Sequence, residues 1–174
     1  MKKLLFGCLG LIVVLILAAV IGVMSLPSTV VVERSRTVNA TPEEVYAVVS
    51  DLHTWPDWTF WSKEADPDCT WDFQGETGDG ASMAWEGPIH GKGKLTLKNC
   101  VPGQQVEYDM VFIEESMASV GSMTLAADGE GTTVTWTMSQ DLEGAGKLLG
   151  LAMDGLIGPM FDQGLVGLDA HLGG

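Results

Sequence analysis

The first part of the chain is its most uniformly hydrophobic stretch. Residues 4–26 carry no charged side chain, and Lys2 and Lys3 precede them. A helix rises about 1.5 Å per residue, so this run is long enough to cross a hydrocarbon layer of about 30 Å. The pattern therefore predicts a transmembrane helix that anchors the chain through residues 1–26. A cleaved signal peptide is the alternative, although its apolar region usually spans only about 7–15 residues.

The positions of the charges predict on which side of a membrane the rest of the chain lies. Both lysines precede the apolar run, and the next basic residue is Arg34. Positively charged flanks stay in the cytoplasm. We therefore expect a single-pass protein of the cytoplasmic membrane, with its N-terminus inside and residues 27–174 in a periplasmic or extracellular space. Cleavage of a signal peptide would instead make this domain a secreted protein.

Shorter periodic patterns follow the apolar run. Residues 28–38 are rich in β-branched side chains and predict a first strand. Thr41, Pro42 and Glu44 have the spacing of a helix start, in which threonine caps, proline takes the first helical position and glutamate completes a capping box. Residues 55–61 predict a short second helix or an irregular turn. One strand and two short helices are thus expected before the next change of pattern.

The rest of the chain alternates first with period two and then with helical spacing. Residues 69–141 form apolar and polar alternations separated by glycine-containing turns, which predict six strands with one buried face and one wet face. Residues 147–172 have helical spacing interrupted by glycines and Pro159, which predicts a long, kinked helix. The whole pattern indicates a single α+β domain over residues 27–174, in which an antiparallel sheet curls around the C-terminal helix.

The charge balance limits the class of partner. The chain has 23 acidic and 9 basic residues, for a formal net charge of −14. Such a surface repels the phosphates of nucleic acids. We therefore expect no nucleic-acid partner.

Several segments resemble one protein family. Asn39–Tyr46 reads NATPEEVY and Asp51–Trp58 reads DLHTWPDW, and Met83–Gly87, Thr133–Trp136 and Gly158–Phe161 follow in the same order. Together they resemble the SRPBCC, or START/Bet v 1-like, polyketide cyclase/dehydrase family over nearly the whole domain. The resemblance implies the helix-grip fold, a seven-stranded antiparallel sheet that holds the last helix around an apolar cavity. Because these motifs mark a helix entry and a turn, they identify a family rather than a reaction.

Large apolar side chains on the inward face are the candidates for a ligand-binding wall. Aromatic rings and flexible methionines suit a cavity that encloses a hydrophobic molecule, although they suit a filled core equally well. The two interpretations stay open at every position. The candidates are Trp58, Trp61, Trp71, Met83, Trp85, Tyr108, Met110, Phe112, Met123, Trp136, Leu149 and Met153.

Arg36 is the one charged candidate. Strand alternation places it on the same face as Val32 and Val38, toward the core. A charge on that face needs a partner. Arg36 could bind an acidic group of a ligand, or it could lie near the sheet edge and reach water or a neighbouring carboxylate.

No motif in the sequence indicates catalysis, a metal or a cofactor. His53, His90 and His171 are scattered, without the spacing of zinc ligands, and no nucleophile signature such as Gly-x-Ser-x-Gly occurs. Cys69 and Cys100 lie at opposite ends of the predicted strands, so two free thiols are expected.

These observations favour a binding module over an enzyme. We expect a membrane-anchored, extracytoplasmic domain that encloses a hydrophobic small molecule or lipid, with no cofactor and no catalytic residue. A polyketide cyclase/dehydrase-type enzyme acting on a hydrophobic substrate is the first alternative, because the same cavity could fold a reactive chain. A scaffold domain with a collapsed cavity is the second.

Overall fold

The computed structural model describes residues 12, 14–18, 20–113 and 117–173. Its elements, in chain order, are β1 (Thr29–Val38), α2 (Pro42–Val49), α3 (Trp55–Trp58), β2 (Thr70–Gln74), β3 (Ser82–Gly87), β4 (Gly91–Val101), β5 (Gln105–Phe112), β6 (Met117–Asp128), β7 (Gly131–Asp141), the 3₁₀ turn η1 (Gly144–Gly146) and α4 (Lys147–His171).

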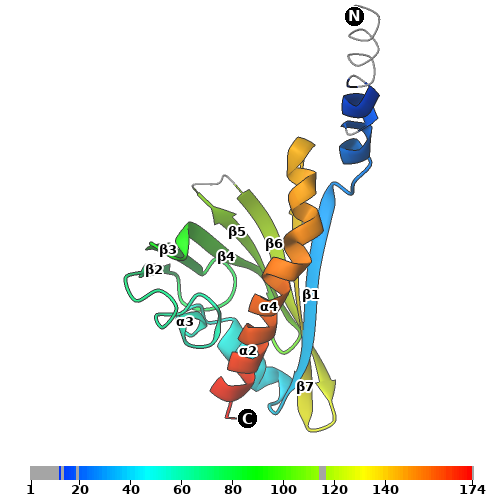
Figure 1. Cartoon of the computed structure of the whole chain (residues 1–174). Coiled ribbons are helices and arrows are strands. Elements are labelled where there is room, and N and C mark those ends of the chain that lie inside the picture. Colours follow the sequence, from blue (N-terminus) through cyan, green and yellow to red (C-terminus); the bar gives the residue numbers. More distant parts are fainter. Residues whose placement is uncertain (1–11, 13, 19, 114–116, 174) are drawn as a thin grey trace, which may run out of the picture.

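The strands form one antiparallel sheet that curves around α4 (Figure 1). Its order is β1-β7-β6-β5-β4-β3-β2, so the first strand pairs with the last and the other strands follow one another as hairpins. Helices α2 and α3 lie near the C-terminal end of α4, where they close that end of the molecule (Figure 1). The predicted seven-stranded sheet and long C-terminal helix are confirmed.

Local sequence signals account for the entry into α2. The Thr41 hydroxyl accepts a hydrogen bond from the Glu44 amide, and the Glu44 carboxylate accepts one from the Thr41 amide at 2.8 Å. This is the capping box that the spacing predicts, with Pro42 in the first turn. The hydrogen bonds from Thr41 hold the pKa of Glu44 below its usual range.

The segment before β1 corrects one prediction. Residues 14–18 and 20–24 are helical, and Lys147 donates hydrogen bonds to the carbonyls of Met24, the last of them, and of Leu26. Residues 4–11 of the expected membrane span lie outside the described residues. In the part of the chain that is described, no helix is both long and apolar enough to cross a bilayer.

This finding overturns the predicted transmembrane helix and, with it, the predicted localisation as a single-pass membrane protein. Among the described helices, α4 reaches the about 20 residues that a crossing needs. Helix α4 has 25 residues but carries Asp154, Asp162 and Asp169.

Glycines let bulky rings lie against the backbone of neighbouring elements. A β-carbon at Gly121 in β6 would overlap the Tyr108 ring, and one at Gly164 in α4 would press against the Trp136 ring at 2.7 Å. Because glycine lacks that carbon, the Tyr108 ring lies over the neighbouring strand β6 and the Trp136 ring lies against α4, and each residue is 1% exposed.

Candidate functional site

A cavity of about 230 Å³ lies between the N-terminal half of α4 and the sheet. Its wall comes from β5, β6, β7 and α4, and its rim comes from the loop after α3 and the turn between β3 and β4. The wall is predominantly apolar. The lining residues are Phe60, Trp61, Ile89, His90, Met110, Phe112, Met117, Ala118, Ser119, Met138, Gln140, Met153, Ile157, Met160 and Phe161.

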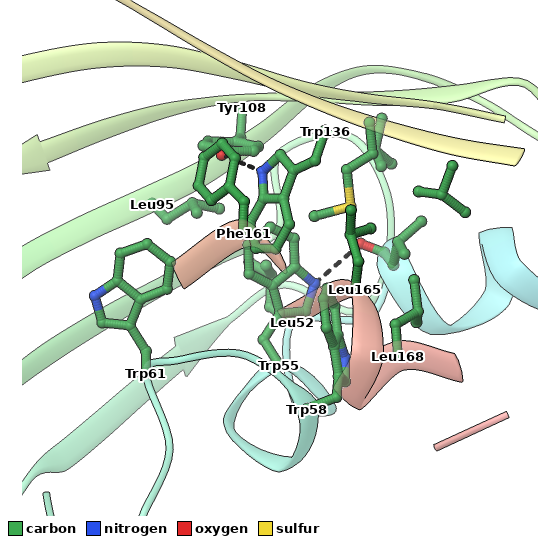
Figure 2. Packing of buried hydrophobic residues seen from close by; sticks show 14 of the residues in the cluster. Leu52, Trp55, Trp58, Trp61, Leu95, Tyr108, Trp136, Phe161, Leu165 and Leu168 are labelled. Carbon is green, nitrogen blue, oxygen red and sulfur yellow. Dashed lines mark hydrogen bonds between the residues drawn. The ribbon is translucent and has the colours of Figure 1, made fainter. Parts of the chain in front are cut away.

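Five aromatic residues close the cavity at one end, and we call them the aromatic cluster: Trp55, Trp58, Tyr108, Trp136 and Phe161. Phe161 stacks on Trp136 with ring centroids 4.2 Å apart, and Trp55 meets both Tyr108 and Trp136 edge to face. Figure 2 shows these rings packed together, with Trp61 standing apart from them. The cluster fills the space beneath the C-terminal half of α4, so that the cavity ends at Phe161.

The polar atoms of the aromatic cluster are satisfied within the core. Trp136 Nε1 donates to the Tyr108 hydroxyl at 2.8 Å, and Trp55 Nε1 donates to the Val49 carbonyl at 3.1 Å (Figure 2). Burial raises the pKa of Tyr108 well above its ordinary value. The hydroxyl is therefore neutral at physiological pH and serves as a structural acceptor.

Beyond the aromatic cluster, three buried methionines line the cavity from the sheet and from α4, and we call them the methionine wall. Met110 and Met138 come from β5 and β7 and are each 3% exposed, and Met153 comes from α4 and is 4% exposed. Methionine is unbranched and flexible, so such a wall adjusts to the shape of what lies against it.

The turn between β3 and β4 is fixed by a buried carboxylate. Asp66 Oδ2 accepts hydrogen bonds from the backbone amides of Ile89 at 2.9 Å and His90 at 2.8 Å. Burial acts to raise the pKa of Asp66, but these amide hydrogen bonds outweigh it and the net pKa is lowered. Trp85 Nε1 completes the anchoring by donating to the His90 carbonyl at 3.2 Å. The rim is thus held in place before any ligand arrives.

Three polar side chains lie on the cavity wall, and each is more than nine-tenths buried. His90, Gln140 and Ser119 are 5%, 6% and 8% exposed. His90 Nε2 lies 3.1 Å from the Ser62 carbonyl, which can only accept, so Nε2 carries a proton and donates it to that carbonyl. His90 Nδ1 is sealed and unpaired. The side chains of Ser119 and Gln140 make no hydrogen bond to any other described residue.

Among the lining residues that the structure describes, none is Asp, Glu, Lys or Arg. Burying a charge without a partner is costly, so this wall suits an uncharged group better than an ion. Across residues 12–113 and 117–173, apart from positions 13 and 19, no group of three or more potential metal ligands gathers. Cys69 and Cys100 are free, as predicted, and burial together with Asp79 raises the pKa of Cys100 to about 12.

The structure distributes the predicted site residues over several environments. Trp61, Met110, Phe112 and Met153 line the cavity. Trp58, Tyr108 and Trp136 belong to the aromatic cluster, and Met83 and Met123 are buried in the solid core. Trp85 lies between Trp61 and Phe112, behind the cavity wall. Trp71 lines a separate surface cleft on β2, and Leu149 is 41% exposed.

Arg36 lies at the sheet edge and outside the cavity. Its side chain is 43% exposed and pairs with Asp169 of α4 at 3.4 Å. Arg34 makes the closer contact to α4, because it binds Asp154 at 2.8 Å and Asp162 at 3.2 Å. Hydrogen bonding to Arg34 lowers the pKa of Asp154. Both arginines therefore face α4, as the alternation indicates, and both contact carboxylates of the same chain.

Sequence reasoning missed the polar residues of the wall. Ser119 precedes Gly121 by two positions in β6, and Gln140 follows Met138 by two positions in β7. Extending the period-two pattern by one step in each strand would have found them. His90 had no such signal, because its position depends on the buried Asp66, which lies 24 residues earlier.

The sheet, the enclosing helix and the apolar cavity define a class of protein, the helix-grip domains that hold a space between a curved sheet and a long helix. The family model described as polyketide cyclase/dehydrase and lipid transport matches residues 29–173. The chain belongs to this family. A comparison with curated proteins finds no match.

Solved structures confirm the fold. The protein CV1439 from Chromobacterium violaceum is 18% identical with a TM-score of 0.59, over 81% of this chain and 96% of that one. The di-domain ARO/CYC StfQ of the steffimycin biosynthetic pathway is 13% identical with a TM-score of 0.63, over 82% and 50%. The Aha1 dimer from Colwellia psychrerythraea is 15% identical with a TM-score of 0.54, over 80% and 98%.

Proposed function

We propose that this domain binds a hydrophobic small molecule in the cavity between α4 and the sheet. The observation that carries the proposal is the change of packing along α4, from the filled aromatic cluster to a partly open apolar space. A core that only stabilises the fold has few voids larger than a water molecule. A space of about 230 Å³ bordered by flexible methionines is instead suited to a guest molecule.

The size of the cavity limits the guest. Sites for drug-sized ligands usually enclose about 300–1,000 Å³. The cavity is smaller, so its preferred guest is a compact molecule of one or two rings, or a short chain. A molecule with two long acyl chains would require α4 to move away from the sheet.

The cyclase-type alternative has weaker support. Such an enzyme needs a group on the cavity wall that exchanges protons with its substrate. Of the described lining residues, His90 carries the side chain type that most often serves as a general acid or base. Its Nε2 is bonded to Ser62 and its Nδ1 is sealed, so this conformation gives a substrate no access to either nitrogen.

A cavity-filling variant tests the proposal. Met153→Trp should fill the space beneath α4, whereas Leu151→Trp places the same ring on a residue of α4 that is 71% exposed. We would titrate the full chain and both variants calorimetrically with naphthalene, 2-naphthol, 2-acetylnaphthalene and 2-naphthoate. We expect at least one compound to bind one-to-one. Its affinity should fall at least about tenfold in Met153→Trp and stay the same in Leu151→Trp. Equal effects of the two variants, or no binding of any compound, would contradict the proposal.

A further inference from the structure

Ser119 and Gln140 lie side by side on the cavity wall. Val120 pairs with Ser139 across β6 and β7, so the next antiparallel positions are Ser119 and Gln140. Met110 faces Ser119 from β5, and Val30 faces Gln140 from β1. Directly opposed residues on neighbouring strands have β-carbons about 4.5–5.5 Å apart. The two polar side chains therefore form one polar spot within an apolar wall.

The polar atoms of Ser119 and Gln140 lack hydrogen-bond partners in the part of the chain that the structure describes, as His90 Nδ1 does, but unlike that atom they are not sealed. Neither side chain bonds to another described residue, although Gln140 is 6% exposed and Ser119 is 8% exposed. Their polar atoms are not among the sealed, unpaired atoms, which are Asp66 Oδ1, Trp71 Nε1 and His90 Nδ1. The hydrogen-bonding groups of Ser119 and Gln140 thus keep accessible surface, and both residues line the cavity.

Buried polar groups cost free energy unless they find a partner. An amide and a hydroxyl together offer both donors and acceptors, so they can bond either a hydroxyl or a carbonyl oxygen. They supply no charge, and the described wall has no Asp, Glu, Lys or Arg that would balance an ion. We propose that Ser119 and Gln140 bind the polar end of an uncharged guest, a hydrophobic alcohol, phenol or ketone, and discriminate against carboxylates.

This inference rests on the proposed binding function, and the matched naphthalene series separates the two. In the unmodified full chain at pH 8, 2-naphthol and 2-acetylnaphthalene should bind about tenfold more tightly than naphthalene. A gain in affinity of this size is typical of one neutral hydrogen bond. The ionised 2-naphthoate should bind at least about tenfold more weakly than 2-naphthol, because its charge would be buried without a partner. This order is measured without any substitution, so it does not depend on the folding of a variant.

A double variant then assigns the preference to the pair. Ser119→Ala with Gln140→Leu should bring naphthalene and 2-naphthol within about twofold of each other, mainly by weakening 2-naphthol. Ser122→Ala is the matched control, since Ser122 lies on the opposite face of β6 and should leave the preference unchanged. If no compound binds, the cavity-binding function itself fails. If all four compounds bind equally well, or the double variant keeps the preference for 2-naphthol, binding stands and the role of Ser119 and Gln140 is refuted.

Discussion

The two halves of the space beneath α4 are built from different side chains and are filled to different degrees. The aromatic cluster occupies one half with rigid rings, which stack at 4.2 Å for Trp136 and Phe161 and fit against glycines of β6 and α4. The methionine wall borders the other half and leaves about 230 Å³ open. Both halves share the same sheet face and the same helix. We infer that the aromatic cluster stabilises the fold, so that the space beside the methionine wall can remain open.

The largest expected effect is the loss of the central ring of the aromatic cluster. Trp136→Ala removes a side chain that is 1% exposed and leaves the Tyr108 hydroxyl without its donor. We expect the free energy of unfolding to fall by about 3–5 kcal/mol. Met153→Ala in the methionine wall should cost about 2 kcal/mol, because that side chain already borders open space. Urea denaturation of both variants measures the difference, and equal losses would remove the distinction between the halves.

A smaller effect concerns how α4 is held at the boundary between the halves. A β-carbon at Gly158 would overlap Nη2 of Arg34, which pairs there with Asp154 and Asp162. Gly158→Ala should therefore displace the guanidinium and weaken both ion pairs, a loss that offsets the helix propensity of about 1 kcal/mol gained with alanine.

Gly155 provides the matched control in the same helix, because a β-carbon there meets no atom within 4 Å. Gly155→Ala should stabilise the fold by about 0.5–1 kcal/mol, since alanine favours a helix interior more than glycine does. Thermal unfolding should thus show a higher midpoint for Gly155→Ala and little change for Gly158→Ala. An equal rise in both variants would show that Arg34 does not constrain the helix at Gly158.

The sequence was sufficient for the fold but not for the division into two halves. Period-two alternation predicts which side of a strand faces α4, and it does so correctly for both Tyr108 and Met110. It does not predict what fills the space opposite. Tyr108 is covered because Gly121 admits its ring, whereas Met110, two positions later, borders the cavity. That difference depends on residues from several elements, which no local pattern combines.

Two further predictions show the same limit. The apolar run before β1 has the composition of a membrane span, yet the described residues hold no helix that could cross a bilayer. Alternation places Arg36 on the inner face but does not decide between a ligand and a carboxylate at the sheet edge; β1 is an edge strand, and Arg36 lies there. Asp169 of α4 becomes its partner only once the chain has folded. Composition and periodicity thus predict elements and faces, and long-range pairing decides what each face meets.

The smallest effect uses pH to address the aromatic cluster alone. Burial raises the pKa of Tyr108, whereas an unfolded tyrosine titrates near its ordinary value of 10.0. Above that pH the unfolded chain releases a proton that the folded chain retains, so stability is full below about pH 10 and declines as the pH rises further. At pH 11, one unit above the ordinary pKa, the Tyr108 contribution amounts to about 1 kcal/mol of lost stability.

Urea denaturation at pH 9 and pH 11 measures this loss, and Tyr108→Phe serves as the comparison because it cannot ionise. Burial also raises the pKa of Tyr46 and Cys100, so the unmodified protein should lose more than the Tyr108 share alone. The difference between the two proteins isolates Tyr108. The same drop in both would mean that the Tyr108 hydroxyl exchanges with solvent, and the aromatic cluster would then be no tighter than the methionine wall.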